Sequence, residues 1–354
     1  MAALVSVAVL VVVVLAVALV GLYRPAGPVE PTGATPTGEP AVTPVPVAEA
    51  VPVWPLTGLP VTDPGDPDRP AVAVKVSDVR QAHPQVGIDR ADVVFVEPVG
   101  VAYTRLAAVF HSEIPVAVGP VRSARPMDAP LLSPTRGVLA STMAAGWVMS
   151  YLDETADVDH LGSLRVPRGT AYETVAGRPS PDHVLVRPPV LLDLTDRSEP
   201  PPPSFGYATD AASSSAGRSG TSGTALTVPY GPSWDVGWTW DAATGTYLRS
   251  QPWGPHVAAD GTRVSAANVL VLRVDSRVEK LAEGSGKPVP VLQLVDASGE
   301  LTALTDGKAV TGTWSKAGVH DPFVLTTSAG QPLRLAPGRT WVEMPTPQAD
   351  VVVR

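Results

Sequence analysis

The densest group of residues able to do chemistry is the string Gly119 to Pro126, which reads Gly-Pro-Val-Arg-Ser-Ala-Arg-Pro. Arg122 and Arg125 lie three residues apart, so their guanidinium groups can converge on one anion if the turn is helical. Arg105, at the start of an apolar strand, is a third candidate. A guanidinium offers a planar fork of donors that matches a carboxylate or a phosphate. The string predicts a ligand-binding site at Arg105, Arg122, Ser123 and Arg125.

A second interpretation of the same arginines is structural. Arg122 and Arg125 could pair with the internal carboxylates of Asp78 and Glu97 and tie neighbouring strands together, because ion-pair networks order a protein as readily as ligands do. In a ligand site, the same two carboxylates would instead support the arginines. The sequence leaves both interpretations open.

His183 is the candidate acid or base and a candidate ligand contact, because imidazole titrates near neutral pH. A lone histidine is also commonly a hydrogen-bonded structural residue. A nucleophile triad of Ser123, His183 and Asp92 lacks the Gly-x-Ser-x-Gly turn that exposes such a serine. The sequence therefore assigns no catalytic residue, with His183 as the one weak candidate.

Metal and cofactor chemistry has little support. Asp157, Asp159 and His160 offer oxygen and nitrogen ligands, but without a recurring histidine spacing they favour a solvated loop. The chain has no Cys, which excludes disulfides, thiolate metal sites, cysteine nucleophiles and a lipidated cysteine. We expect no metal and no cofactor.

Four of the eight tryptophans lie within 20 residues. Aromatic faces can stack on sugar rings, which would make this group a glycan platform. Alternatively, Trp238 and Trp240 share one face of a strand and fill the core of a small β domain. The four residues are Trp234, Trp238, Trp240 and Trp253.

Composition sets the elements that must position these residues. The 354 residues carry 34 acidic and 26 basic side chains, a net charge of -8, so no basic face is expected and nucleic acid is excluded as a partner. The 40 Pro and 31 Gly favour long linkers and a loop-rich fold that leans towards sheet. The length allows two ordinary domains.

Residues 1–24 predict a membrane segment. Residues 2–22 are uncharged and apolar, and 21 helical residues span roughly 30 Å, the thickness of a hydrocarbon core. The run lacks the basic start of a secretory signal, which favours an uncleaved single-pass anchor over a cleaved, secreted form. Arg24 taken alone would place the domains in the cytoplasm. The absence of Cys and the segment that follows favour extracytoplasmic domains.

Residues 25–53 carry eight prolines, three Glu and no basic residue, a composition that predicts a disordered stalk. At about 3.1 Å per residue such a stalk reaches up to roughly 90 Å.

Residues 54–195 are expected to form an α+β or α/β domain, with strands at 71–76, 92–96 and 106–110 and a helical segment at 127–152. Residues 196–225 shift to Pro, Ser and Gly and predict a disordered linker. Residues 226–354 show short strands at regular intervals and predict a compact antiparallel β domain, with a hairpin at 238–247.

A series of motifs runs through both predicted domains. In chain order they are Pro55 to Gly58, Arg69 to Val76, His83 to Gly87, Ala91 to Glu97, Thr104-Arg105, Gly119 to Pro126, Thr246 to Ser250, Pro255-His256, Ala267 to Val271 and Gly312 to Trp314. This order resembles the YerB-like family of bacterial lipoproteins. The resemblance implies an envelope protein with an N-terminal and a C-terminal domain of unknown function, and it supplies no reaction.

Two departures from that family matter. Its members are similar to lipoproteins with a Cys after the signal, and this chain has none, so a protein anchor or release would replace the lipid. Where the family pattern looks like Ile-Asp-Asn, this chain has Val76-Ser77-Asp78. Where the pattern looks like Pro-His-Asn-Leu, this chain has Asp182 to Leu185. Any role that depends on an amide at those places does not carry over.

Three functions follow as hypotheses. The first is a tethered envelope protein that binds an anionic ligand, a wall polymer or peptide, through the arginines. The second is an envelope hydrolase with His183 as general base beside Glu97 or Asp78. The third is a scaffold whose partners dock on the β domain. The sequence favours binding over catalysis and leaves the oligomeric state open.

Overall fold

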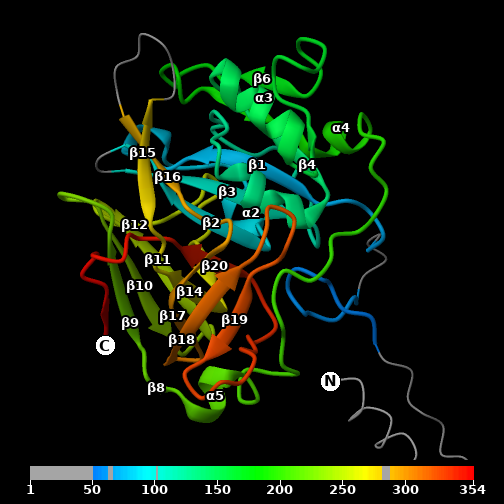
Figure 1. The fold of residues 1–354 in the computed structure, drawn as a ribbon. Helices are drawn as coiled ribbons and strands as arrows, with labels where there is room; N and C mark the ends of the chain where they lie inside the picture. Colours follow the sequence, from blue (N-terminus) through cyan, green and yellow to red (C-terminus); the bar gives the residue numbers. More distant parts are fainter. Residues whose placement is uncertain (1–50, 63–66, 101–102, 281–287) are drawn as a thin grey trace, which may run out of the picture. The chain divides into compact units, whose positions relative to one another are not determined.

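The computed structural model describes residues 51–62, 67–100, 103–280 and 288–354. Two β-sheets dominate this part of the chain, and a few short helices accompany them (Figure 1). The expected membrane segment and residues 25–50 of the expected stalk lie outside the described residues. Within the described residues, no helix has the length and apolar character needed to cross a membrane.

The larger sheet has eleven strands. In sheet order they are β19 (Val324–Thr327), β18 (Lys308–Lys316), β17 (Ala297–Thr305), β14 (Asn268–Leu272), β20 (Thr340–Glu343), β2 (Val93–Pro98), β3 (Thr104–Phe110), β1 (Val72–Ser77), β4 (Val138–Ala140) and β5 (Asp159–His160), with β8 (Thr221–Ser222) paired to β18.

The smaller sheet has six strands. They are β12 (Gly254–Pro255), β11 (Thr246–Gln251), β10 (Asp235–Asp241), β9 (Ala225–Pro229) and β21 (Val352–Val353), with β13 (Ser265–Ala266) paired to β11. Two ribbons complete the strands: β15 (Ser276–Lys280) with β16 (Pro288–Leu292), and β6 (Tyr172–Thr174) with β7 (Val184–Val186).

The helices are short. The α-helices are α2 (Asp128–Leu132), α3 (Gly146–Thr155), α4 (Pro188–Leu192) and α5 (Ser215–Ser219), and the 3-10 helices are η1 (Arg80–Ala82), η2 (Ile88–Arg90) and η3 (Ser133–Thr135).

Strands β1, β2 and β3 confirm the three Val-rich runs expected at the start of the folded chain. All their residues are buried, because both faces of the larger sheet are covered. One face, with Val74, Val94 and Ala108, packs against the smaller sheet, including Trp238. The other face packs against α2 and α3 and continues into the C-terminal half. A buried strand places charged side chains on either face without exposure to water, which matters for the site below.

The expected helical segment 127–152 is correct only at its ends. After α2 and η3 the chain forms the strand β4, and α3 begins at Gly146. Pro134 limits helix continuation. Gly137 lets the backbone approach β1 closely, since an added Cβ would lie 2.2 Å from the carbonyl oxygen of Ala71. Pairing with β1 therefore overrides the local helical composition.

The two predicted domains share the larger sheet. Strand β20, near the C-terminus, runs parallel between β14 and β2, with Val342 opposite Phe95. The expected purely antiparallel pattern of the C-terminal half is therefore wrong for β14 and β20. The hairpin expected at 238–247 is confirmed as β10 and β11.

The expected linker 196–225 is ordered over much of its length. The Ser214 hydroxyl caps α5 by accepting a hydrogen bond from Gly217 N at 3.0 Å, and β8 then pairs with β18. Asp210 Oδ1 likewise accepts a hydrogen bond from Ser213 N at 2.7 Å. Such helix caps and turns closed by side-chain hydrogen bonds explain why a Ser-rich sequence is ordered here.

Candidate anion-binding site

The segment from Arg122 to Arg125 is held between two strands of the larger sheet. Arg122 N donates to Lys75 O on β1 at 2.8 Å, and Ala124 N donates to Met143 O at 2.9 Å, beyond the end of β4. Because β1 and β4 are parallel, this segment lies at the carboxyl ends of both strands. That edge is where open sheets with parallel strands commonly bind ligands.

A buried ion-pair group lies beneath this segment. Lys75 Nζ is 2.5 Å from Glu97 Oε1 and 2.6 Å from Asp128 Oδ1, and all three side chains are fully buried. The second oxygen of Asp128 accepts a hydrogen bond from Arg125 N at 2.7 Å, so the group also fixes the segment above it. Burial raises the pKa of Glu97 to about 8, against the opposing effect of Lys75.

Arg105 connects this group to the segment. It is only 4% exposed, and its Nη1 donates to Ser123 O at 3.0 Å. Burial lowers the pKa of Arg105 to about 9, and the nearby charges of Arg125 and Arg122 lower it further in the same direction. The three guanidinium groups therefore lie close enough to repel one another. We call Arg105, Arg122 and Arg125 the basic cluster.

The basic cluster has unused donors. Arg122 Nε and Arg125 Nε are buried and have no hydrogen-bond partner among the described residues. The nearest carboxylate oxygen to Arg122 is Asp182 Oδ1, at 3.7 Å from Nε. Arg125 Nη1 donates to its neighbour Ala124 O at 2.8 Å. Burial lowers the pKa of Arg125, against the opposing effects of Asp128 and Glu97.

The two carboxylates suggested as partners of these arginines are paired with other cations. Glu97 contacts Lys75, and Asp78 contacts Arg249 at 3.1 Å. The structure thus brings Arg105, Arg122, Ser123 and Arg125 together, with Glu97 below them, and places Asp78 in a different cluster. Around the site, Lys75 and the three arginines outnumber Glu97, Asp128 and Asp182, which leaves surplus positive charge.

His183 lies beside the site through its neighbour in the chain, Asp182. The His183 carbonyl accepts a hydrogen bond from Val175 N at 2.8 Å, and its Nδ1 is buried without a partner among the described residues. Neither Asp78 nor Glu97 contacts its imidazole. The arrangement needed for a general base at His183 is therefore not assembled by those carboxylates.

The triad and metal groups considered from the sequence do not converge. Asp92 accepts hydrogen bonds from the amides of His111 and Ser112, each at 2.7 Å. Asp157 pairs with Arg197 at 2.8 Å. The other two members also have separate partners: Asp159 accepts from Thr195 Oγ1, and His160 Nε2 contacts Ser141 Oγ at 2.8 Å.

A second polar cluster, which was not predicted from the sequence, lies between the two sheets. Asp78 lies at its centre and also contacts Thr104 at 2.6 Å, Gln251 at 2.7 Å and His83 at 3.2 Å. Burial would raise the pKa of Asp78, but Arg249, His83 and His256 hold it well below its usual range. His83, Arg249 and His256 all occur in the motifs that carry the family resemblance, and their place in those motifs was the feature of the sequence that could have indicated this cluster.

Arg249 joins the two sheets within this cluster. Its guanidinium lies between Asp78 and Glu343 of the larger sheet, 3.7 Å from Glu343 Oε1, and its Cζ is 4.7 Å from the centre of the Trp341 ring. Burial lowers the pKa of His256, and the charge of Arg249 lowers it further, so His256 is neutral. Its Nδ1 accepts a hydrogen bond from Arg249 Nη1 at 3.0 Å, and its Nε2 lies 2.6 Å from Gln85 Oε1. These contacts hold the sheets together.

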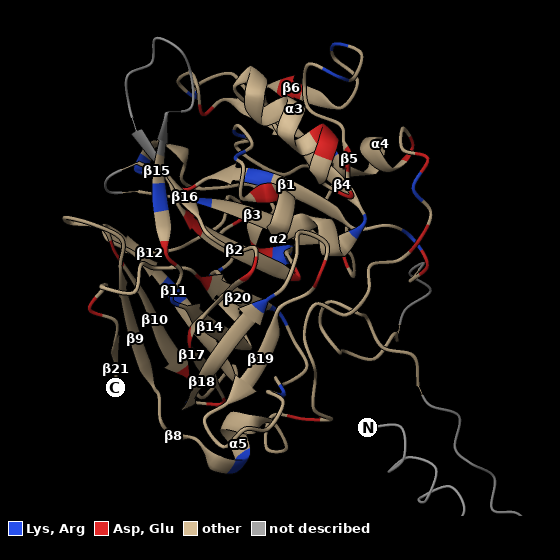
Figure 2. Cartoon of the chain, in the orientation of Figure 1, with Lys and Arg blue, Asp and Glu red and all other residues tan. Residues whose placement is uncertain are grey.

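Basic and acidic residues are interspersed over the described elements (Figure 2). The surplus charge of the basic cluster is therefore a local feature. The basic cluster is also distinct from a large cavity in the described part of the chain.

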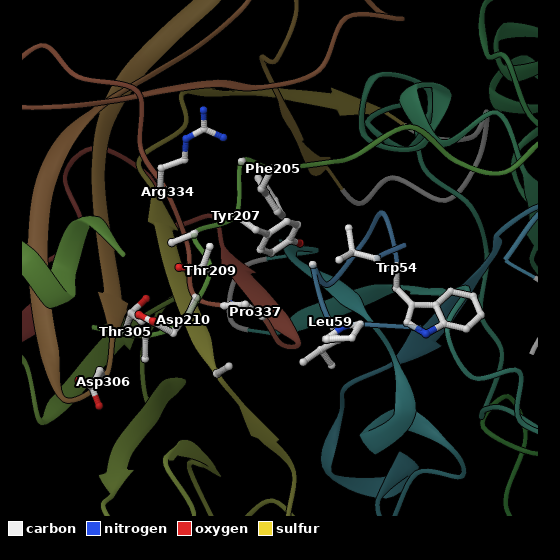
Figure 3. Close-up of a pocket in the computed structure, with 18 of the residues that line it drawn as sticks. Trp54, Leu59, Phe205, Tyr207, Thr209, Asp210, Thr305, Asp306, Arg334 and Pro337 are labelled. Atoms are coloured by element: carbon white, nitrogen blue, oxygen red, sulfur yellow. The ribbon is translucent and has the colours of Figure 1, made fainter. Parts of the chain in front are cut away.

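That cavity measures about 870 Å³ and is mostly apolar. Trp54 and Leu59 lie on one side, Asp210, Thr305 and Asp306 lie on the other, and Phe205 and Tyr207 lie between them (Figure 3). None of the residues proposed from the sequence as the anion site or as the acid or base lines it, whereas Trp240 of the Trp-rich group does.

Comparison with known proteins agrees with this architecture. Residues 56–200 match the family "Protein of unknown function (DUF3048) N-terminal domain", and residues 226–342 match the corresponding C-terminal domain. A 71-residue stretch is 45% identical to "Putative lipoprotein YerB" of Bacillus subtilis, and it spans 20% of this chain and 21% of that relative.

The fold is similar to the crystal structure of the YerB protein from Bacillus subtilis, with a TM-score of 0.70 and 21% identity. That match covers 85% of this chain and 99% of the other. At this identity the likeness shows the fold. With both domain matches, the chain belongs to the DUF3048 family of proteins of unknown function.

Proposed function

We propose that this protein is a membrane-anchored envelope protein that binds an anionic ligand through the basic cluster. The ligand carries a carboxylate or a phosphate, as cell-wall polymers and peptides do. The placement in the envelope is supported by the relative described as a lipoprotein and by the apolar run of residues 2–22. Arg122 and Arg125 contact the ligand, and Arg105 positions Ser123 from below.

The observation that carries this proposal is a pair of buried guanidinium donors, Arg122 Nε and Arg125 Nε, that have no hydrogen-bond partner among the described residues. A buried donor without a partner costs free energy, so native proteins rarely keep one without a reason. Here Arg122 Nε and Arg125 Nε both lack partners among the described residues, in the same small region. A bound carboxylate or phosphate would satisfy both donors and offset the repulsion among the three arginines.

We propose binding and not hydrolysis. A hydrolase would need His183 to be oriented by Asp78 or Glu97, and each of these carboxylates is hydrogen-bonded to other groups. Arginines whose charges are poorly compensated are suited to holding an anion, and this role needs no proton transfer.

The test is calorimetric titration of the full chain in detergent with citrate and with inorganic phosphate. We expect binding that weakens more than tenfold in Arg122→Ala and in Arg125→Ala, because each loses charge-assisted hydrogen bonds. Arg165→Ala is the matched control, since Arg165 does not belong to the basic cluster and forms an ion pair of 2.6 Å with Asp153. Equal affinities in the wild type and both cluster variants would refute the proposal.

A further inference from the structure

A row of aromatic rings begins beside the basic cluster. The ring centres of Tyr103 and Trp234 are 6.5 Å apart, those of Trp234 and Trp253 are 5.4 Å apart, and those of Trp253 and His83 are 5.0 Å apart. Each pair meets edge to face. We call Tyr103, Trp234 and Trp253 the aromatic row.

Two hairpin turns of the smaller sheet hold this row in place. Trp234 lies between β9 and β10, and Trp253 lies between β11 and β12. Because β10 and β11 are antiparallel, the two turns lie at the same end of the sheet. The indole Nε1 of Trp234 donates to Thr104 Oγ1 at 3.3 Å, and Thr104 in turn donates to Asp78. The row is therefore fixed to the start of β3, the strand that carries Arg105.

The row is more exposed than the tryptophans that fill the core. Trp238 and Trp341 are each only 1% exposed and pack against each other between the sheets. Tyr103 is 39% exposed, and Trp234 and Trp253 are half-buried. The core interpretation of the Trp-rich region is thus correct for Trp238, while the members of the row keep surface that the core does not use.

The row and the basic cluster meet at Tyr103. Tyr103 directly precedes β3 and is separated from Arg105 of the basic cluster by one residue, and its ring centre is 6.5 Å from that of Trp234. Half-exposed aromatic rings provide apolar faces for the CH groups of sugar rings. Guanidinium groups provide forked donors for carboxylates and phosphates. A ligand that uses both must combine a sugar ring with an acidic group.

We propose that the anionic ligand is an acidic glycan, with a sugar ring against the aromatic row and its carboxylate or phosphate at Arg122 and Arg125. This inference rests on the proposed function. A simple anion would leave the row unused, and a neutral glycan would leave the arginines unsatisfied. Single-stranded nucleic acid also combines stacking with phosphate, but its binding needs a basic groove that follows several phosphates, and the basic cluster is a local feature of a chain of net charge -8.

The experiment titrates the full chain in detergent with two matched series. One compares a galacturonic acid trisaccharide, the neutral galactose trisaccharide of the same linkage and citrate. The other compares glucose 6-phosphate, glucose and inorganic phosphate, and an oligothymidylate serves as the nucleic acid probe. We expect at least one acidic sugar to bind about tenfold more tightly than both its neutral counterpart and its simple anion.

Variants separate the row from the basic cluster. Trp253→Ala and Tyr103→Ala are expected to weaken the acidic sugar about five- to tenfold and to leave the simple anion unchanged, because stacking is lost and the arginines remain. Trp240→Ala is the control, since Trp240 lies at the opposite end of β10. Thermal unfolding of each variant confirms that it is folded.

Each remaining outcome counts against a defined statement. If simple anions bind through the arginines but no acidic sugar binds more tightly, or if the row variants bind it as the wild type does, the glycan inference is wrong and anion binding stands. If no anion binds, the proposed function is wrong as well. Tighter binding of the oligothymidylate than of every acidic sugar overturns the glycan in favour of nucleic acid.

Discussion

Lys75 is the cation of the buried ion-pair group that supports the basic cluster. It is fully buried and contacts Glu97 and Asp128 together. Lys75→Met would leave two carboxylates facing each other without a cation. We expect it to lower the free energy of unfolding by about 3 to 5 kcal/mol, the usual cost of breaking a buried ion pair. Urea unfolding checks this.

The control for Lys75 is Glu97→Gln, which keeps a polar side chain beside Lys75 and leaves the cation paired with Asp128. We expect Glu97→Gln to lower the free energy of unfolding clearly less than Lys75→Met does. If Lys75→Met lowered the free energy of unfolding by less than about 1 kcal/mol, the ion-pair group would not stabilise the fold appreciably.

His160 gives the chain a pH dependence of definite sign. Burial, followed by the charge of Arg165, lowers its pKa to about 4, from an ordinary value of 6.5. Between these values the unfolded chain binds more protons at this site than the folded chain does. The stability that neutral His160 contributes is therefore fully present above pH 6.5 and is lost as the pH falls towards 4.

His160→Gln tests this sign, because glutamine keeps a polar group near Ser141 and cannot titrate. We expect the wild type to lose up to about 3 kcal/mol more than the variant between pH 6.5 and 4. Parallel curves of unfolding free energy against pH for the two proteins would contradict it. Comparing the two proteins removes the effects of other titrating groups, including Glu97.

At the residue scale, the sequence predicted which arginines gather and not what their charges meet. Arg122, Ser123 and Arg125 share one short string, so local spacing was enough to group them. Their neighbour Lys75 was not singled out, because it lies 47 residues before Arg122 and meets it only through strand pairing. Asp78 and Arg249 are 171 residues apart, and no local pattern joins them.

At the scale of elements, Arg249 on β11 acts as a bridge between the sheets. Arg249→Met would leave Asp78 and Glu343 buried without their shared cation, and we expect a loss of more than about 3 kcal/mol of unfolding free energy. Arg249→Lys keeps the charge and loses the fork and the stacking on Trp341, so it should fall between the variant and the wild type. Chemical denaturation of the three proteins checks this order; equal stabilities would contradict it.

Single elements followed from the sequence where the pattern was local. The strands β1, β2 and β3 were predictable because each is a Val-rich run bounded by turn residues, and the hairpin of β10 and β11 was predictable because its turn residues lie between two short strands. Strand β4 was not predictable from the sequence, because three residues carry too little pattern. Its pairing also depends on the close approach of Gly137 to Ala71, which lies 66 residues earlier in the chain. Parallel partners are supplied by distant chain, which composition cannot reveal.

For the molecule as a whole, the decisive pairing is that of β20 with β2 and β14. This four-residue strand completes a sheet built from both halves, and its Glu343 also accepts from Trp238 Nε1 at 2.9 Å. Residues 51–354 should therefore unfold as one cooperative unit, although two family domains match them.

Removal of residues 338–354 tests that cooperativity. The truncation exposes the edge of β2, whose strand is buried on both faces, and deletes Trp341 from the core. We expect both halves to lose structure together, because an unpaired central strand leaves unsatisfied backbone groups and a large apolar cavity. Circular dichroism and amide dispersion in NMR spectra report on this. If the N-terminal half of the truncated chain kept dispersed amide signals, the two halves would be independent folding units and the shared sheet would be a docking contact between them.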